Sequence, residues 1–106
     1  MRAKRVALHI DTSKTKEASI ALSIDGRTYT KHSLSSTAKA QALLGLIATA
    51  LREHALHTQD LKEITVVTGP GSFTGLRVGL SVANALGTLL HIPINGKKAL
   101  ATPAYS

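Results

Sequence analysis

The chain has 106 residues, 43% of them hydrophobic and 18% charged, which is enough to bury one hydrophobic core in a single domain. Lys and Arg outnumber Asp and Glu by 13 to 6, and the net charge of +7 favours contact with RNA or with an acidic protein surface. The absence of Cys excludes disulfides, thiolate metal sites and a Cys nucleophile, and it is typical of a cytoplasmic protein. With one Phe, two Tyr and no Trp, the chain is poorly suited to stacking on single-stranded bases. No apolar run reaches ~18 residues without polar interruption, so we expect no membrane span.

The first part of the chain predicts three antiparallel strands. The mostly apolar segment Arg5–Asp11 is expected to form the first strand. Ala18–Ile24 alternates between apolar and small residues, as a half-buried strand does. Asp25-Gly26 is a strong hairpin signal, so we expect Arg27–Leu34 to return as the third strand.

Two helices and two further strands are expected to follow. The first helix runs from about Ala38 to His54, after capping hydroxyls at residues 35–37, and it has one apolar face. A β-branched strand at Ile64–Val67 leads through a glycine-rich turn into a second helix, Thr74–Leu90. A short fifth strand is expected at Ile92–Gly96, with its proline near the start, where a missing N–H is tolerated.

This order predicts a single α/β domain over residues 1–106. The elements follow the sequence β-β-β-α-β-α-β, which places an antiparallel trio and parallel βα crossovers in one mixed five-stranded sheet. The same layout is found in the ribonuclease H-like fold, which also forms one half of the actin-like ATPases (the ASKHA superfamily).

The glycine-rich turn at residues 69–75 is a candidate phosphate-binding loop. It lacks the Lys of a P-loop, and the dinucleotide fingerprint fails because Thr74 stands at its third glycine position. Asp11 ends the first strand at the place where the actin-like ATPases wrap a phosphate. The residues that a nucleotide would contact are therefore Asp11, Thr12, Gly69, Gly71 and Ser72. The alternative is a tight structural turn in which Ser72 or Thr74 caps the following helix.

The sequence does not predict a catalytic or metal site. Two-metal nuclease chemistry needs several acids at strand ends, and only Asp11 stands at such a position. His54 and His57 are spaced i, i+3 at a helix end, without a recognisable third ligand. We therefore expect no catalytic residue, no metal and no cofactor.

The helix Thr74–Leu90 carries the strongest functional signal. Its polar residues fall on one narrow stripe, and everything else is apolar or small. Glycine or alanine recurs every four residues from Gly75 to Gly87, which gives a smooth face that another helix could approach closely. A helix that is apolar around most of its circumference must be buried on more than one side. We therefore expect a partner protein to contact Leu43, Ile47, Leu51, Gly75, Leu76, Gly79, Ala83, Leu86, Gly87 and Leu90.

The run GPGSFTGLRVG at residues 69–79, with Ile10-Asp11-Thr12-Ser13 and the order of elements, resembles the TsaB (YeaZ) family. These are bacterial proteins of tRNA threonylcarbamoyladenosine biosynthesis. The resemblance covers the N-terminal half of a usual member, so the second actin-like lobe is expected to be absent. One departure lies near the start of the first helix, where members often carry His-Ser and this chain has Ala40-Gln41.

The resemblance implies a non-catalytic scaffold subunit. Its two helices would pair with TsaD, the transferase that carries the nucleotide and metal, and the ATPase TsaE would join. TsaD-like chains carry paired histidines after the strand that follows the glycine turn, whereas residues 95–101 here offer no metal ligand. The basic surface is a candidate contact for tRNA, and the chain alone is expected to self-associate weakly through the same helices. The alternatives are a nucleotide-binding or ATP-hydrolysing half-domain that uses the Gly69–Gly75 turn, and a homodimer with a different interaction role.

Overall fold

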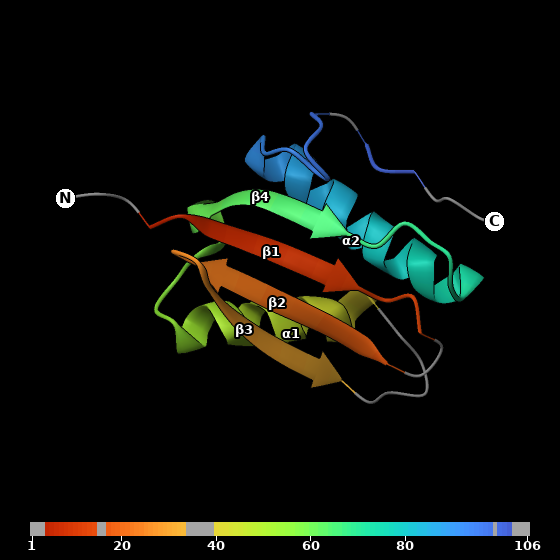
Figure 1. The fold of residues 1–106 in the computed structure, drawn as a ribbon, viewed down its shortest axis with the longest axis horizontal. Helices are drawn as coiled ribbons and strands as arrows, with labels where there is room; N and C mark the ends of the chain where they lie inside the picture. The colour runs from red at the N-terminus through yellow and green to blue at the C-terminus, as the bar shows by residue number, and fades with distance from the viewer. Residues whose placement is uncertain (1–3, 15–16, 34–39, 99, 103–106) are drawn as a thin grey trace.

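The computed structural model describes residues 4–14, 17–33, 40–98 and 100–102. Its four strands form one sheet in the order β3-β2-β1-β4, as Figure 1 shows. β1 pairs antiparallel with β2 and parallel with β4, so the sheet is mixed, as expected. The elements are β1 (Val6–Asp11), β2 (Ala18–Ile24), β3 (Arg27–Ser33), α1 (Ala40–Glu53), a 3-10 turn (Thr58–Asp60), β4 (Leu61–Val66) and α2 (Phe73–Leu90).

A tight hairpin joins β2 to β3. Asp25 and Gly26 at its tip have φ angles of 50° and 88°, the left-handed pair that a two-residue hairpin turn requires. The Asp25 carboxylate accepts a hydrogen bond of 2.9 Å from the amide of Arg5, which ties the hairpin to the start of β1. The hairpin signal in the sequence is confirmed.

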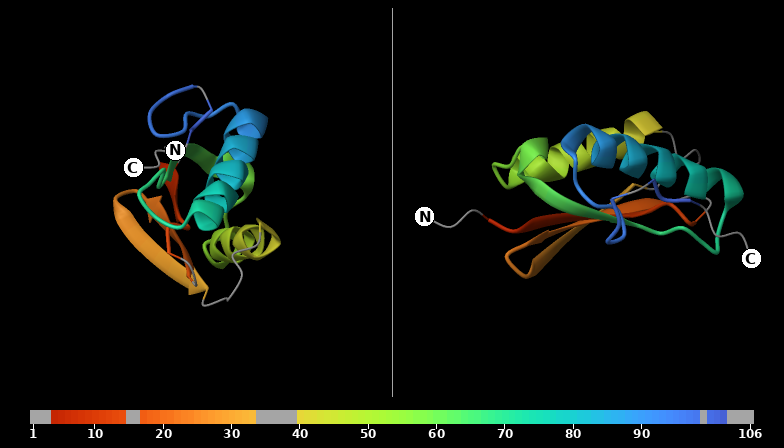
Figure 2. Two further views of the ribbon diagram at one scale, coloured as in Figure 1. Left: turned by 90° about the vertical axis from the view of Figure 1, so that its right-hand side faces the viewer. Right: turned by 90° about the horizontal axis from the view of Figure 1, so that it is seen from above.

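Both helices cover the same face of the sheet, as Figure 2 shows. The side chains of β1 alternate strictly, with Val6, Leu8 and Ile10 wholly buried toward the helices. Leu43 and Ile47 of α1 are buried on the same side. The opposite face of the sheet carries small and polar side chains from the alternate positions of each strand, among them His9, Ser19, Ala21, Thr30 and Thr65.

Length and composition alone would allow α2 to span a membrane. Eight of its residues are buried against the sheet and α1, however, which is what a core helix of a globular domain shows. We therefore treat α2 as a core helix.

The expected fifth strand is reduced to a single bridge. Ile94 pairs with Ile64 of β4, and then Asn95 and Gly96 adopt φ angles of 51° and 80° that turn the chain back on itself. The Asn95 side chain continues the pairing in place of a strand: its Oδ1 accepts from the Val66 amide at 2.8 Å, and its Nδ2 donates to the Val66 carbonyl at 3.1 Å. The prediction of a five-stranded sheet is wrong for the described residues, because a side-chain amide replaces the backbone of the fifth strand.

The observed starts of β4 and α2 differ from the expected starts by a few residues. β4 begins three residues earlier than expected, at Leu61, and α2 begins one residue earlier, at Phe73. The hydroxyls expected to cap the first helix, at residues 35–37, lie outside the described residues.

Candidate functional site

Thr12, the residue after β1, connects the end of this strand to the start of α2 through hydrogen bonds. This side chain is completely buried; its hydroxyl donates to the Gly75 carbonyl at 2.6 Å and accepts from the Gly79 amide at 3.2 Å. A Cβ on Gly75 would meet the Thr12 carbonyl oxygen, and a Cβ on Gly79 would meet the Thr12 hydroxyl. Gly75 and Gly79 therefore allow α2 to approach the end of β1 closely, and no second helix packs at these two positions.

The glycine-rich turn is closed by contacts within the chain. The Ser72 amide donates to the Ser13 carbonyl at 2.7 Å, and a Cβ on Gly71 would collide with Ser13. The Ser72 hydroxyl caps α2 by accepting from the Gly75 amide at 3.3 Å. The Ser72 amide is thus bonded to Ser13, which follows β1, and the Ser72 hydroxyl is used within α2 itself.

Asp11 shapes the turn that follows β1. Its Oδ1 accepts hydrogen bonds from the Ser13 amide at 2.9 Å and from the Ser13 hydroxyl at 2.6 Å. Partial burial opposes the charged form, but the two bonds from Ser13, helped by His9 and Lys14, outweigh it and hold the pKa of Asp11 below its ordinary value. Asp11 thus caps the turn that follows β1.

The lowered pKa of Asp11 predicts a contribution to acid sensitivity. A carboxylate with a depressed folded-state pKa contributes stability above its unfolded value, about pH 4, and loses it as the pH falls through the folded value. We expect Asp11→Asn to flatten the fall in unfolding free energy between about pH 5 and pH 2. Urea unfolding of both proteins at several pH values measures this; parallel pH profiles would contradict the role given to Asp11.

The hydroxyl of Thr12 is expected to contribute measurably to stability. Thr12→Val keeps the shape but removes both hydrogen bonds to α2, which should cost about 1–3 kcal/mol of unfolding free energy. The control is Thr65→Val, the same change at an exposed position of β4. Chemical unfolding of the two variants tests this, and equal stabilities would show that the Thr12 bonds contribute nothing.

The residues expected to contact a partner are mostly inside the domain. All of them except the half-buried Leu90 are buried by the chain itself. The glycine face of α2 packs on β1, and a Cβ on Gly87 would meet the Ile94 side chain. In this fold the expected set belongs to the core, and other residues of the two helices are exposed.

Those other residues form two exposed ridges, which we call the two-helix surface. Each ridge follows the i, i+4 spacing, which turns by about 40° at each step, so a ridge crosses the exposed side of its helix obliquely. The ridges consist of Ala40, Leu44, Ala48 and Arg52 in α1, and of Phe73, Arg77, Ser81, Ala85 and Leu89 in α2. Leu44, Phe73 and Leu89 are 45%, 54% and 74% exposed, so the surface carries three large apolar side chains that a partner could bury.

The two-helix surface is hollowed at both ends. One hollow of about 400 Å³ lies between the helix starts and is lined by Ala40, Phe73, Arg77 and Ser81, among others. A second, of about 500 Å³, lies beside the end of α1 and is lined by Ala48, Arg52 and the residues that follow the helix. Figure 2 shows that the helices run side by side with their starts at the same end. The two hollows lie beside the ridges, and side chains of a partner could fit into them.

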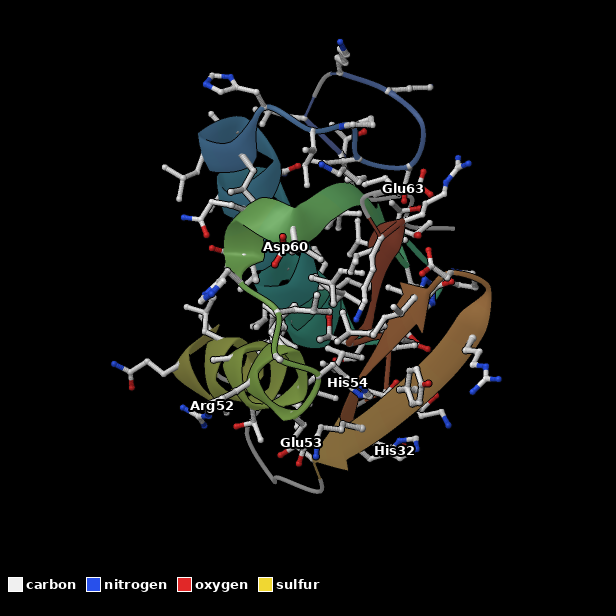
Figure 3. All side chains as sticks on the ribbon, turned by 90° about the vertical axis from the view of Figure 1, so that its left-hand side faces the viewer. His32, Arg52, Glu53, His54, Asp60 and Glu63 are labelled. Carbon is white, nitrogen blue, oxygen red and sulfur yellow. The ribbon has the colours of Figure 1, made fainter. Side chains whose placement is uncertain are left out.

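Charged groups at the end of α1 are divided between its two sides. Glu53 pairs with Lys31 of β3 at 2.9 Å, and the His54 ring lies 4.2 Å from that of Tyr29. In Figure 3, Arg52 points away from β3, whereas Glu53 and His54 lie toward it.

In the part of the chain that the structure describes, no three His, Cys, Asp or Glu side chains gather as metal ligands would.

Known proteins with related sequences and folds identify the family. Residues 32–106 match the family described as TsaD: tRNA N6-adenosine threonylcarbamoyltransferase. The chain is 32% identical over 97 residues to the tRNA threonylcarbamoyladenosine biosynthesis protein TsaB of Escherichia coli K12, covering 92% of this chain and 42% of that protein. It is 48% identical over 46 residues to TsaB of Bacillus subtilis 168, covering 43% of this chain and 20% of that protein.

A solved structure of YeaZ from Pseudomonas aeruginosa superposes with a TM-score of 0.79 and 30% identity, over 85% of this chain and 42% of that one. The chain belongs to the TsaD-type family, and within it to the TsaB (YeaZ) proteins. The family resemblance seen in the sequence is thereby confirmed. The chain spans less than half the length of the TsaB and YeaZ proteins it matches.

Sequence reasoning missed the exposed members of the site. The sequence places Leu44 on the apolar face of the first helix, Leu89 among the apolar residues of the second, and Phe73 within the glycine-rich turn. A count of the i, i+4 series from Ala40 and from Phe73 could have found both ridges. The second helix is apolar around most of its circumference, so its sequence does not show which apolar side the sheet covers.

Proposed function

We propose that this chain is a non-catalytic scaffold domain in tRNA threonylcarbamoyladenosine biosynthesis and that it pairs with a TsaD-type transferase through the two-helix surface. The observation that carries the proposal is the exposure of Leu44, Phe73 and Leu89 on the two helices that share one side of the sheet. The names of the TsaB relatives support the pathway. In this proposal the domain is one ribonuclease H-like half of the actin-like (ASKHA) fold.

The chemistry at the β1 end supports a scaffold role over a catalytic one. The Thr12 hydroxyl bonds to α2, and the Ser13 carbonyl accepts from the Ser72 amide. The Ser13 hydroxyl donates to Asp11, and the Ser72 hydroxyl accepts from the Gly75 amide. A nucleotide-binding half-domain would need the same turn to open toward a phosphate. We therefore expect no specific heat when MgATP is titrated into the chain by calorimetry, and saturable binding that is lost in Ser72→Ala would favour the nucleotide-binding alternative.

The remaining partners follow from the same proposal. TsaE would join the complex of this chain with the transferase, in the cytoplasm, and tRNA would be held in part by the excess of basic residues. Weak self-association through the two-helix surface is expected when the transferase is absent.

The proposal is tested by mixing the chain with the TsaD-type transferase of the same organism. Size-exclusion chromatography with light scattering should show a complex whose mass is the sum of the two proteins. Elution of two separate proteins at concentrations well above those in the cell would overturn the pairing.

A further inference from the structure

The two-helix surface carries an unbalanced positive charge. Arg77 is the only charged residue in α2, and α1 contains only Arg52 and Glu53. Glu53 is engaged by Lys31 on the side of α1 that faces β3. The ridges of the surface therefore present two cations and no carboxylate.

Neither arginine is neutralised within the described residues. The Arg77 guanidinium stacks 5.4 Å above the centroid of the Phe73 ring, and Arg52 reaches only the Thr49 hydroxyl, at 3.5 Å. The described residues that form ion pairs are Lys14, Glu17, Lys31, His32 and Glu53, and all lie away from the two ridges. Burying an unpaired guanidinium is costly, so any partner that covers these two must supply acceptors for them.

The arginines stand at opposite ends of the surface. Arg77 lines the hollow at the helix starts, and Arg52 lines the hollow at the end of α1. From Ala40 to Arg52 the α1 ridge rises about 18 Å, at about 1.5 Å per residue. A partner must therefore place carboxylates at two separated points, with apolar side chains between them opposite Leu44, Ala48 and Ala85.

We infer that the two-helix surface selects a protein surface that bears carboxylates opposite Arg52 and Arg77, and that it disfavours a second copy of this chain. In a two-fold symmetric pair each copy contributes the same patch. Such a pair would place four arginines in one interface, and the one carboxylate of α1 and α2, that of Glu53, is already paired with Lys31. Like charges across an interface suppress the wrong partner and opposite charges favour the right one. This inference rests on the proposed function, because it describes the partner of that same surface.

Charge reversal tests the inference. The double variant Arg52→Glu plus Arg77→Glu should bind the TsaD-type transferase at least about tenfold more weakly than the unmodified chain in calorimetry at low salt. The matched control is Arg27→Glu, which reverses an exposed arginine at the β2–β3 hairpin and should leave the affinity unchanged. Raising the salt concentration should weaken binding of the unmodified chain more than binding of the double variant.

Self-association provides the second arm. In sedimentation velocity, an equimolar mixture of the unmodified chain and the double variant should associate more strongly than either protein alone, because the mixture pairs arginines with glutamates. Binding to the transferase that is insensitive to both reversals would overturn this inference and leave the proposed function standing. Self-association of the unmodified chain as tight as its binding to the transferase would also overturn it. If the unmodified chain does not bind the transferase at all, the proposed function and this inference fall together.

Discussion

Replacing Gly75 by Ala is expected to lower the unfolding free energy by about 1–3 kcal/mol, the usual cost of forcing extra atoms into a packed interior. The added Cβ would meet the backbone carbonyl oxygen of Thr12. Thr12 is fully buried and hydrogen-bonded to α2, so it cannot move aside without breaking the contact between β1 and the helix. Thermal unfolding followed by circular dichroism should show a lower midpoint, by roughly 4–8 °C per kcal/mol for a domain of this size.

The control for this prediction is Gly45→Ala in α1. Gly45 is exposed, and nothing lies within 4 Å of the position that its Cβ would take. Alanine is the better helix former by up to about 1 kcal/mol, so this variant should be more stable than the unmodified chain. The two substitutions are chemically identical and should have opposite signs. Equal effects would mean that α2 does not approach Thr12 as closely as described.

The double substitution Leu44→Asp plus Leu89→Asp is expected to weaken binding to the transferase by at least about 30-fold, the loss associated with one interface hot spot. Both side chains are exposed and lie on different ridges of the two-helix surface, so neither change should disturb the core. Calorimetric titration measures the affinity, and the thermal midpoint shows whether the domain remains folded.

Leu100→Asp is the matched control for that double variant. Leu100 is 65% exposed and lies with Thr88 and His91 beside the end of α2, off both ridges. This variant makes one such replacement where the double variant makes two, and it should leave the affinity unchanged. If Leu100→Asp weakens binding as much as the double variant does, the interface must be placed on the C-terminal segment instead.

The antiparallel part of the fold and the positions of both helices could be predicted from the sequence because their signals are local. Asp25-Gly26 specifies a tight turn through its backbone preferences, and the alternation in Ala18–Ile24 specifies one buried face. The fifth strand could not be predicted correctly. Its β-branched residues predict a strand, but Asn95 pairs with β4 through its side chain, and its positive φ angle turns the backbone away from the sheet.

The candidate site was harder to predict, for a physical reason. Glycines in a helix indicate a close approach without indicating what approaches, and here it is Thr12, which lies 63 residues before Gly75 in the chain. The spacing of Gly75, Gly79 and Gly87 is the same whether a sheet or a second helix packs on them. Only the tertiary structure shows that the sheet covers this face and that the ridge beginning at Phe73 is exposed.

A single-thiol footprint tests the central claim most directly. Ser81→Cys places the only thiol of the chain in the middle of the α2 ridge, and Thr30→Cys places it on the open face of the sheet. Maleimide labelling of each variant is followed with and without the TsaD-type transferase. We predict that the transferase slows labelling at position 81 and leaves position 30 unchanged. Unchanged labelling at position 81 in a sample where the complex is formed would contradict pairing through the two-helix surface.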